Sequence, residues 1–336
     1  MNWSQPYSAT WRIFRVNRKT WADAEKLTSV DSADVTRTAD GDLIESGSLK
    51  VTGDFETGYY RIVMTAQQGG DVERVDIATL LFGTEGGEVD YGRTVHEVDG
   101  FSVLHPASTT TIVTGQYAPA GVDGAQYAAE LLREAINAPV VVEGSFTLNE
   151  HLVHEFGSSV LEAAWAVLDA GEFVIQIDGR GIVHICPKPY SPSLTIDNAR
   201  KGILLNKIDF SADTSEIPNR YIVMDGLNVT IAINDDPDSP VSSVSRGYYV
   251  DSVNTSPTPV NSETHAEYAN RMLKKASILK DERSYKREYA PDVYPYSLVR
   301  ASIDGLMGDL RVESQSISCG RGITVSERAS REVSLW

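Results

Sequence analysis

The sequence predicts a mostly β protein of the α+β class, in which two small β-barrel-like domains flank an α/β domain and a helix is inserted in the C-terminal part. Short β-rich runs fill the first 115 residues and much of the chain after residue 200. A pattern of one helix followed by one hairpin lies between them, at 158–189. The 336 residues exceed the ~100–200 residues of one domain. We therefore expect domains at 1–115, 116–200 and 201–336.

The first domain is predicted from runs of β-forming residues that glycines separate at turn-like intervals. The runs are 11–16, 47–52, 59–66, 72–83 and 93–104. No convincing amphipathic helix interrupts them, so a small, strongly bent barrel or sandwich is the simplest prediction. Aromatic side chains are expected to fill its core or line its rim. They are Trp11, Phe14, Trp21, Tyr59 and Tyr60.

The α/β domain begins after a Gly/Pro/Ala-rich connector at 115–124. Asp123 can cap a helix whose apolar residues recur at helical spacing until Pro139, and a strand is expected at 140–142. Ser159 and Glu162 have the spacing of a capping box, which predicts the start of a second helix. Its apolar face would be Leu161, Ala164, Trp165 and Leu168. The domain thus holds two helices.

A β-hairpin is predicted directly after this second helix. Gly171 is expected to take the left-handed position that ends the helix. The hydrophobic period then becomes two from Phe173 to Ile177, and the run Asp178-Gly179-Arg180-Gly181 indicates a turn. The returning strand ends at Pro187, because proline cannot donate to a ladder.

The third domain is again rich in β-forming runs, at 202–210, 220–224, 228–233, 248–253, 296–303, 310–317 and 323–334. A polar, proline-rich loop at 235–240 lies among them. Thr264 and Glu267 form a second capping-box pattern. It predicts an inserted helix at 262–283 whose apolar residues are Ala269, Met272, Leu273, Ala276 and Leu279.

Charge and cysteine content limit the partners and the compartment. A net charge of −17 argues against a tight grip on nucleic acid, because that affinity comes from lysine and arginine. Such a surface suits DNA that slides past, although solubility explains the acidity equally well. The chain has neither a signal-peptide pattern nor an apolar run of about 20 residues, which predicts synthesis and retention in the cytoplasm. Cys186 and Cys319 are expected to be free thiols, Cys186 packing on a hairpin.

Two groups of residues have spacings that metal sites use. His151, His154 and Glu155 could share one side of a helix, but no third zinc ligand is close in sequence, so packing or surface roles are favoured. The loop with Asp235, Asp236 and Asp238 lacks the glycine and the glutamate that an EF-hand needs at its sixth and twelfth positions. A solvated loop is favoured there over weak calcium binding. We expect no metal site and no cofactor.

Catalytic motifs are missing from the sequence as well. It contains no G-x-S-x-G elbow, no phosphate-binding G-x-x-x-x-G-K-[ST] loop and no G-x-G-x-x-G after a strand. We therefore assign no catalytic residue and expect that the protein is not an enzyme. One basic cluster is expected to be a solvated helix face, or else a docking face for an acidic neighbour. It comprises Arg271, Lys274, Lys275, Lys280, Arg283, Lys286 and Arg287.

The order of motifs in the C-terminal half resembles one protein family. The capped helix with its hairpin at 158–189 is followed by NKIDF at 206–210, by IPNRYIV at 217–223 and by the long helix after Ser262. This order is similar to that of the baseplate hub, or tail-tip hub, proteins of long-tailed bacteriophages. The N-terminal half matches the family as a strand-rich module of the right size.

The resemblance implies a structural virion protein rather than an enzyme. Hubs of this family are homotrimers whose two barrel-like domains alternate around a ring, close the tail tube and connect it to the host-attachment apparatus. The implied partners are the distal tail or tail tube protein, the tape-measure protein, and tail fibre or spike proteins. Genomic DNA would pass only transiently during ejection, and this chain would insert into no membrane. The alternatives are a distal tail ring protein and a β-rich carbohydrate-active enzyme.

Overall fold

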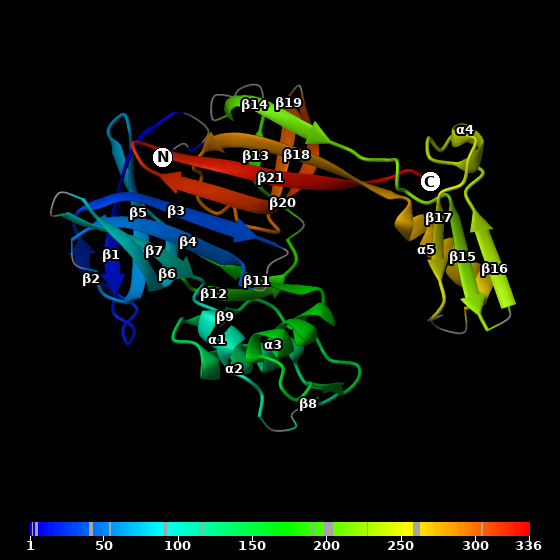
Figure 1. The fold of residues 1–336 in the computed structure, drawn as a ribbon, viewed down its shortest axis with the longest axis horizontal. Coiled ribbons are helices and arrows are strands. Elements are labelled where there is room, and N and C mark those ends of the chain that lie inside the picture. The colour runs from blue at the N-terminus through cyan, green and yellow to red at the C-terminus, as the bar shows by residue number, and fades with distance from the viewer. Residues whose placement is uncertain are drawn as a thin grey trace. The chain divides into compact units, whose positions relative to one another are not determined.

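The structure is a computed structural model that describes every residue except 2, 4, 5, 40–42, 54, 91, 92, 114, 116, 190, 198–203, 227, 258–262 and 304. The chain forms two compact units, each built from two chain segments (Figure 1). Unit 1 comprises Met1–Ile208 and Ser284–Ala329, and unit 2 comprises Asp209–Arg283 and Ser330–Trp336. The three-domain division expected from the sequence stays a prediction.

One large sheet holds most strands from both ends of the chain. Its strands are β1 (Ser8–Val16), β2 (Asp23–Leu27), β3 (Val30–Thr38), β4 (Glu45–Thr52), β5 (Gly58–Gln68), β6 (Asp71–Asp90), β7 (Arg93–Phe101), β13 (Pro192–Ile196), β14 (Leu204–Ser211), β18 (Ile278–Glu288), β19 (Leu298–Ile303), β20 (Leu306–Cys319) and β21 (Ile323–Ser334). The main path runs β14-β18-β21-β20-β3-β4-β7-β6-β5-β1-β2, and β13 and β19 branch from β20. The protein is thus mostly β, as predicted.

The pairing of β3 with β20 joins the two β-rich parts of the sequence in this one sheet. The two strands are antiparallel, with Val35 opposite Ile317 and Ala33 opposite Cys319. All four of these side chains are buried in one core, together with residues of β1, β4, β5 and β6. Among the described residues the path ends at β14 and at β2, so no barrel is closed.

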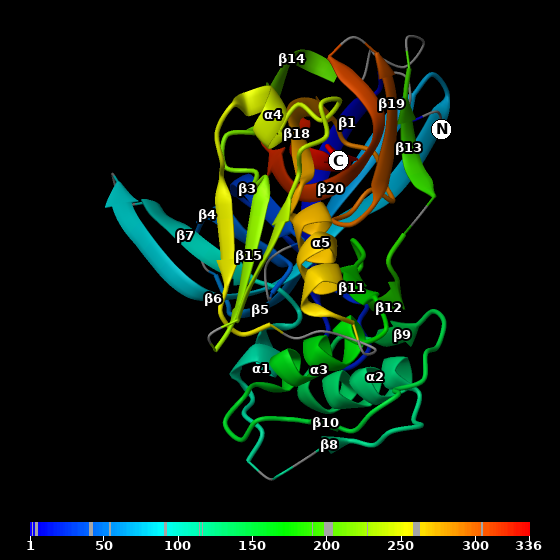
Figure 2. The same ribbon diagram turned by 90° about the vertical axis from the view of Figure 1, so that its right-hand side faces the viewer.

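The α/β part of unit 1 combines three helices with a small sheet, as Figure 2 shows. The helices are α1 (His105–Thr109), α2 (Gly124–Ala135) and α3 (Val160–Asp169). The small sheet has the order β11-β12-β9, with β9 at Val140–Val142, β11 at Phe173–Ile177 and β12 at Val183–Pro187. A short antiparallel pair joins β8 (Tyr117–Ala118) to β10 (Leu152–Val153). Leu132, Leu161, Leu168 and Ile175 belong to the shared core.

The predicted caps are confirmed. The Asp123 side chain accepts hydrogen bonds from the backbone N–H groups of residues 125 and 126. Ser159 and Glu162 form a complete capping box at α3, and Thr264 and Glu267 form another at α5 (His265–Ala276). Such caps satisfy N–H groups that a helix cannot pair internally.

Three local expectations were wrong. Helix α1 lies in the N-terminal stretch where no helix was expected; its five residues are too few to show a periodic pattern. Glu172, with φ of 56°, takes the left-handed position predicted for Gly171. Gly171 is instead required by packing, since a Cβ there would lie 2.4 Å from the Phe146 ring. The inserted helix ends at Ala276, so Leu279 and Lys280 lie on strand β18. Residue 262, its expected start, lies outside the described residues.

Unit 2 is built around a three-stranded sheet of order β16-β15-β17. Its strands are β15 (Arg220–Asp225), β16 (Asn228–Ile233) and β17 (Asp251–Asn254), and a short helix α4 (Ser243–Arg246) precedes β17. Helix α5 covers one face of the sheet, where Tyr221, Val223 and Ala232 pack against Tyr268 and Leu273. Trp336 packs against this core.

Candidate functional site

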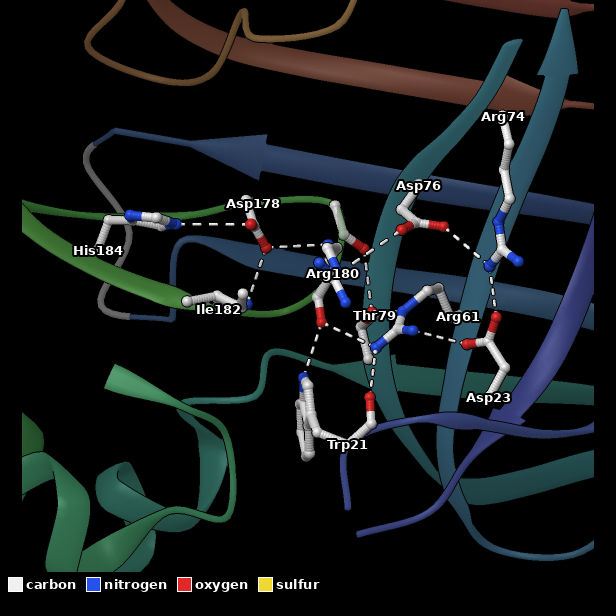
Figure 3. A network of polar contacts seen from close by, with 11 residues as sticks. Trp21, Asp23, Arg61, Arg74, Asp76, Thr79, Asp178, Arg180, Ile182 and His184 are labelled. Carbon is white, nitrogen blue, oxygen red and sulfur yellow. Dashed lines mark hydrogen bonds and ion pairs between the residues drawn. The ribbon is translucent and has the colours of Figure 1, made fainter. Parts of the chain in front are cut away.

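The turn between β11 and β12 takes part in a network of polar contacts that Figure 3 draws. We call residues 178–181 the docking turn. The Asp178 carboxylate accepts hydrogen bonds from the backbone N–H of Arg180 at 2.9 Å and of Ile182 at 2.8 Å. Gly181 has φ of 73°, which glycine adopts without strain. The turn is therefore held in one conformation by its own residues.

Gly179 brings the docking turn into contact with the backbone of β6. A Cβ atom at this position would lie 1.6 Å from the carbonyl oxygen of Asp76. The Thr79 hydroxyl, which is fully buried, donates to the carbonyl of Gly179 at 3.0 Å. Only glycine permits this approach of two backbones. The hairpin of the α/β part is thereby fixed to the large sheet.

Arg61 on β5 completes this junction, and its side chain is only 3% exposed. Its Nε donates to the Thr79 hydroxyl at 3.0 Å, and Nη2 donates to the Arg180 carbonyl at 3.1 Å. Nη1 donates to an Asp23 carboxylate oxygen at 2.6 Å. The indole N–H of Trp21 donates a hydrogen bond of 2.8 Å to the same Arg180 carbonyl. A buried guanidinium needs such a complete set of acceptors, because an unpaired one would be costly.

Ion pairs continue the network at the surface. Arg74 binds both Asp23 and Asp76, and Arg180 lies 3.9 Å from Asp76. A cavity of about 700 Å³ adjoins these residues and is also lined by Asp178. Charges of both signs line it, and those of Arg74, Arg180 and Asp76 are engaged with one another. The arrangement is that of a structural junction.

His184 on β12 links the docking turn to Glu143. Its Nε2 lies 3.5 Å from a carboxylate oxygen of Asp178, and its Nδ1 lies 2.7 Å from one of Glu143. These contacts raise the pKa of His184 above its ordinary value of 6.5, the hydrogen bond with Asp178 contributing most, although burial opposes them. Both carboxylates favour the charged imidazolium.

This pKa shift predicts a pH-dependent contribution to stability. Because the pKa is higher in the folded chain, the contribution is complete below the unfolded value near 6.5 and is lost as the pH rises through the folded value. His184→Gln should therefore lower the free energy of unfolding more at a pH of about 5.5 than at about 8.5. Urea denaturation of both proteins at the two pH values measures this. A loss that is equal at both pH values would contradict the assignment.

Two further buried ion pairs lie in the cores of the large sheet. Arg37 on β3 donates to Glu45 on β4 at 2.5 Å, and both side chains are at most 2% exposed. Arg287 on β18 donates to Glu327 on β21 at 2.6 Å, and Tyr285 also binds this carboxylate. Burial and the Glu327 charge raise the pKa of Tyr285, which keeps the phenol protonated. The first pair thus joins β3 to β4, and the second joins β18 to β21.

The two histidines that the sequence offered as metal ligands have different partners in the structure. His151 Nδ1 accepts from the backbone N–H of Ala120 at 3.2 Å, whereas His154 is buried and contacts the Tyr127 hydroxyl through Nε2 at 3.2 Å. Burial lowers the pKa of His154 and so favours the neutral ring. Within the described part of the chain, no three His, Cys, Asp or Glu residues form a group that could hold a metal ion.

The acidic loop and the basic cluster are largely engaged in local contacts. The Asp236 carboxylate accepts from the backbone N–H of Asp238 at 2.9 Å, as in a self-contained turn. In the basic cluster, Arg271 pairs with Glu263 at 2.9 Å, and Lys274 lies over the Trp336 ring at 5.3 Å. The cluster is not one helix face, because Lys280, Arg283, Lys286 and Arg287 lie on β18.

Both cysteines are free and buried. Burial raises the pKa of Cys186 to about 11 and that of Cys319 to about 12. These thiols are therefore protonated at neutral pH and are poor nucleophiles. Over the described ranges, no helix is long and apolar enough to cross a membrane.

Sequence reasoning recognised the docking turn as a turn but not its contact with β6. Arg61, Thr79 and Asp76 are more than 95 residues away from it in the chain, and no spacing rule connects them. The available signal was the pair of glycines in Asp178-Gly179-Arg180-Gly181, because a two-residue turn needs fewer. In the structure Gly181 takes the left-handed conformation, and Gly179 makes the close backbone contact.

Comparisons with known proteins identify the fold. No family model and no curated protein matches the sequence. A tail protein from Neisseria meningitidis is similar in structure, with a TM-score of 0.65, 13% identity and coverage of 97% of each chain. The 43 kDa tail protein of prophage MuSo2 from Shewanella oneidensis has a TM-score of 0.62 and 13% identity, covering 96% of this chain and 98% of its own.

A third similar structure is a Francisella PdpA–VgrG complex, with a TM-score of 0.60 and 9% identity. The match covers 97% of this chain and 58% of that one. At these identities the likeness concerns the fold, and it extends over almost the whole chain. The chain therefore has the fold of phage tail proteins, as its sequence resemblance to the phage hubs implied.

Proposed function

We propose that this protein is a hub at the tip of a phage tail, a non-enzymatic virion component that closes the tail tube as a homotrimeric ring. The observation that carries the proposal is the two-way coverage. Two tail proteins match this chain over at least 96% of their length and of its own. A shared fold alone leaves function open. The match leaves no large part of this chain or of the two tail proteins uncovered. Together with the hub-like order of motifs in the C-terminal half, this favours a hub.

Closed symmetry gives a physical reason for a ring. Identical subunits that meet head to tail leave one interface unused at each end unless the assembly closes on itself. Strand β2 ends the path of the large sheet, so its outer edge has no strand partner among the described residues. Such edges are commonly covered by a neighbour. In the proposed ring the domains 1–115 and 201–336 alternate, with 116–200 beside them.

The proposed partners follow from this position. They are the distal tail or tail tube protein on one side, the tape-measure protein inside, and tail fibre or spike proteins below. The Francisella structure is a complex of VgrG with PdpA, which supports an assembly with further proteins. Genomic DNA would pass through the ring during ejection. Because the chain has a net charge of −17, it repels the DNA backbone and should not hold the DNA in the channel.

The mass of the purified protein in solution tests the proposal. Sedimentation equilibrium should give three times the chain mass of 36.7 kDa. A hexamer would favour the alternative of a distal tail ring protein. A monomer would contradict a ring of either kind and return the β-rich carbohydrate-active enzyme as the candidate.

A further inference from the structure

The sheet of unit 2 has an apolar face on the side away from α5. Residues directly opposite each other on neighbouring strands point to the same face. Ile222 on β15 lies opposite Ile231 on β16 and Val253 on β17, and Met224 lies opposite Val229. Ile233, two residues from Ile231, shares their side because strand residues alternate. We call this surface the outer face.

The outer face is exposed in the single chain. Ile231 is 52% exposed, and Val229 and Val253 are each 55% exposed. The opposite face is already buried, since Tyr221 and Val223 lie under α5. An antiparallel pair such as β15 and β16, with one face on a core, normally presents polar residues on the other face. Apolar residues on both faces therefore indicate that the outer face is covered in the assembled protein.

The charges on the outer face cancel. Arg220 and Asp251, opposite each other in the register, form a two-pronged ion pair with both N–O distances at 2.6 Å. The Tyr249 ring lies 4.2 Å from the guanidinium carbon and covers it. The outer face thus presents rows of apolar side chains, and the ion pair of Arg220 with Asp251 lies at one end of these rows. This neutrality contrasts with the charge of −17 on the whole chain.

We propose that the outer face is a contact between neighbouring copies of this chain in the trimer. This inference rests on the proposed homotrimer and adds the surface that holds it together. Copies of an acidic chain repel each other wherever acid meets acid, so they can associate closely on a neutral, apolar surface. The ion pair of Arg220 with Asp251 is satisfied within each copy, so it adds no net charge to such a contact.

A pair of double variants tests this contact. Val229→Asp with Ile231→Asp places two charges on the outer face and should reduce the mass from three chains to one. Asn270→Asp with Lys275→Gln lowers the net charge by the same amount on exposed positions of α5 and should leave the trimer intact. Circular dichroism and the thermal midpoint check that both variants are folded. Sedimentation equilibrium at equal concentrations gives the masses.

A milder substitution keeps the test valid if the aspartates prevent folding. Both native cysteines are buried, so Ile231→Cys introduces one accessible thiol. In the trimer, maleimide should label Cys at 231 more slowly than the control Lys275→Cys, and dilution to monomers should remove the difference. If the wild-type protein is a trimer but both double variants remain trimers, or both thiols react equally fast, this inference is wrong and the proposed hub stands. A monomeric wild-type protein would instead contradict the hub itself.

Discussion

Gly179→Ala should destabilise unit 1 by at least about 3 kcal/mol, because the new Cβ would occupy the position of a backbone atom. The nearest atoms are the carbonyl oxygen and carbon of Asp76, at 1.6 and 2.3 Å, and neither belongs to a flexible side chain. The docking turn must therefore move away from β6. This movement would break the hydrogen bonds that Thr79 and Arg61 make to the turn. Buried polar groups left without partners cost about 1–3 kcal/mol each.

Gly70→Ala is the matched control for this variant. Gly70 lies in the turn between β5 and β6, and a Cβ there would have no atom within 4 Å. Its φ also lies outside the left-handed region. We expect a change of less than about 0.5 kcal/mol. Urea denaturation compares the variants, and equal midpoints for the two would show that the docking turn does not hold the hairpin to the sheet.

Leu168→Ala should lower the free energy of unfolding by roughly 2–5 kcal/mol, as truncations in packed cores do. Leu168 lies on the apolar face of α3 and is fully buried in the core shared with the β11–β12 hairpin. Removing its side chain takes away apolar contact and leaves a cavity that the surrounding helices and strands fill only partly. Differential scanning calorimetry or denaturant titration measures the loss.

Lys275→Ala is the control for Leu168→Ala. Lys275 is an exposed residue in the last turn of α5, so its truncation should change stability by less than about 0.5 kcal/mol. A loss as large as that of Leu168→Ala would mean that the core has been assigned to the wrong helix face. A Leu168 variant as stable as the wild type would lead to the same conclusion.

Elements whose local signals agree were predictable from the sequence. The capping box at Ser159, the apolar stripe of α3 and the alternation from Phe173 to Ile177 all indicated the same boundaries, and the structure has α3 and β11 there. The same holds for α2 and for the start of α5 at Thr264. In each case propensity, period and cap depend only on neighbouring residues.

Two strands that carry a buried arginine, β3 and β18, were not predicted. On β3, Ala33, Val35 and Arg37 alternate as buried residues, but an arginine at a core position hides the period. Only its pairing with Glu45, on another strand, makes that burial possible. The buried Arg287 of β18 depends in the same way on Glu327 of β21. Tertiary pairs of this kind have no local signature, and the contact of the docking turn with β6 was missed for the same reason.

A three-fold averaged density map of the purified protein tests the central claim most directly. The proposed hub predicts one ring of three subunits in which six similar β-rich domains alternate around a single axis, with an open channel between them. Two domains per chain must then look alike, although their sequences share no motif. A monomeric particle, a ring of another order, or a C-terminal domain without likeness to the N-terminal one would contradict the proposal.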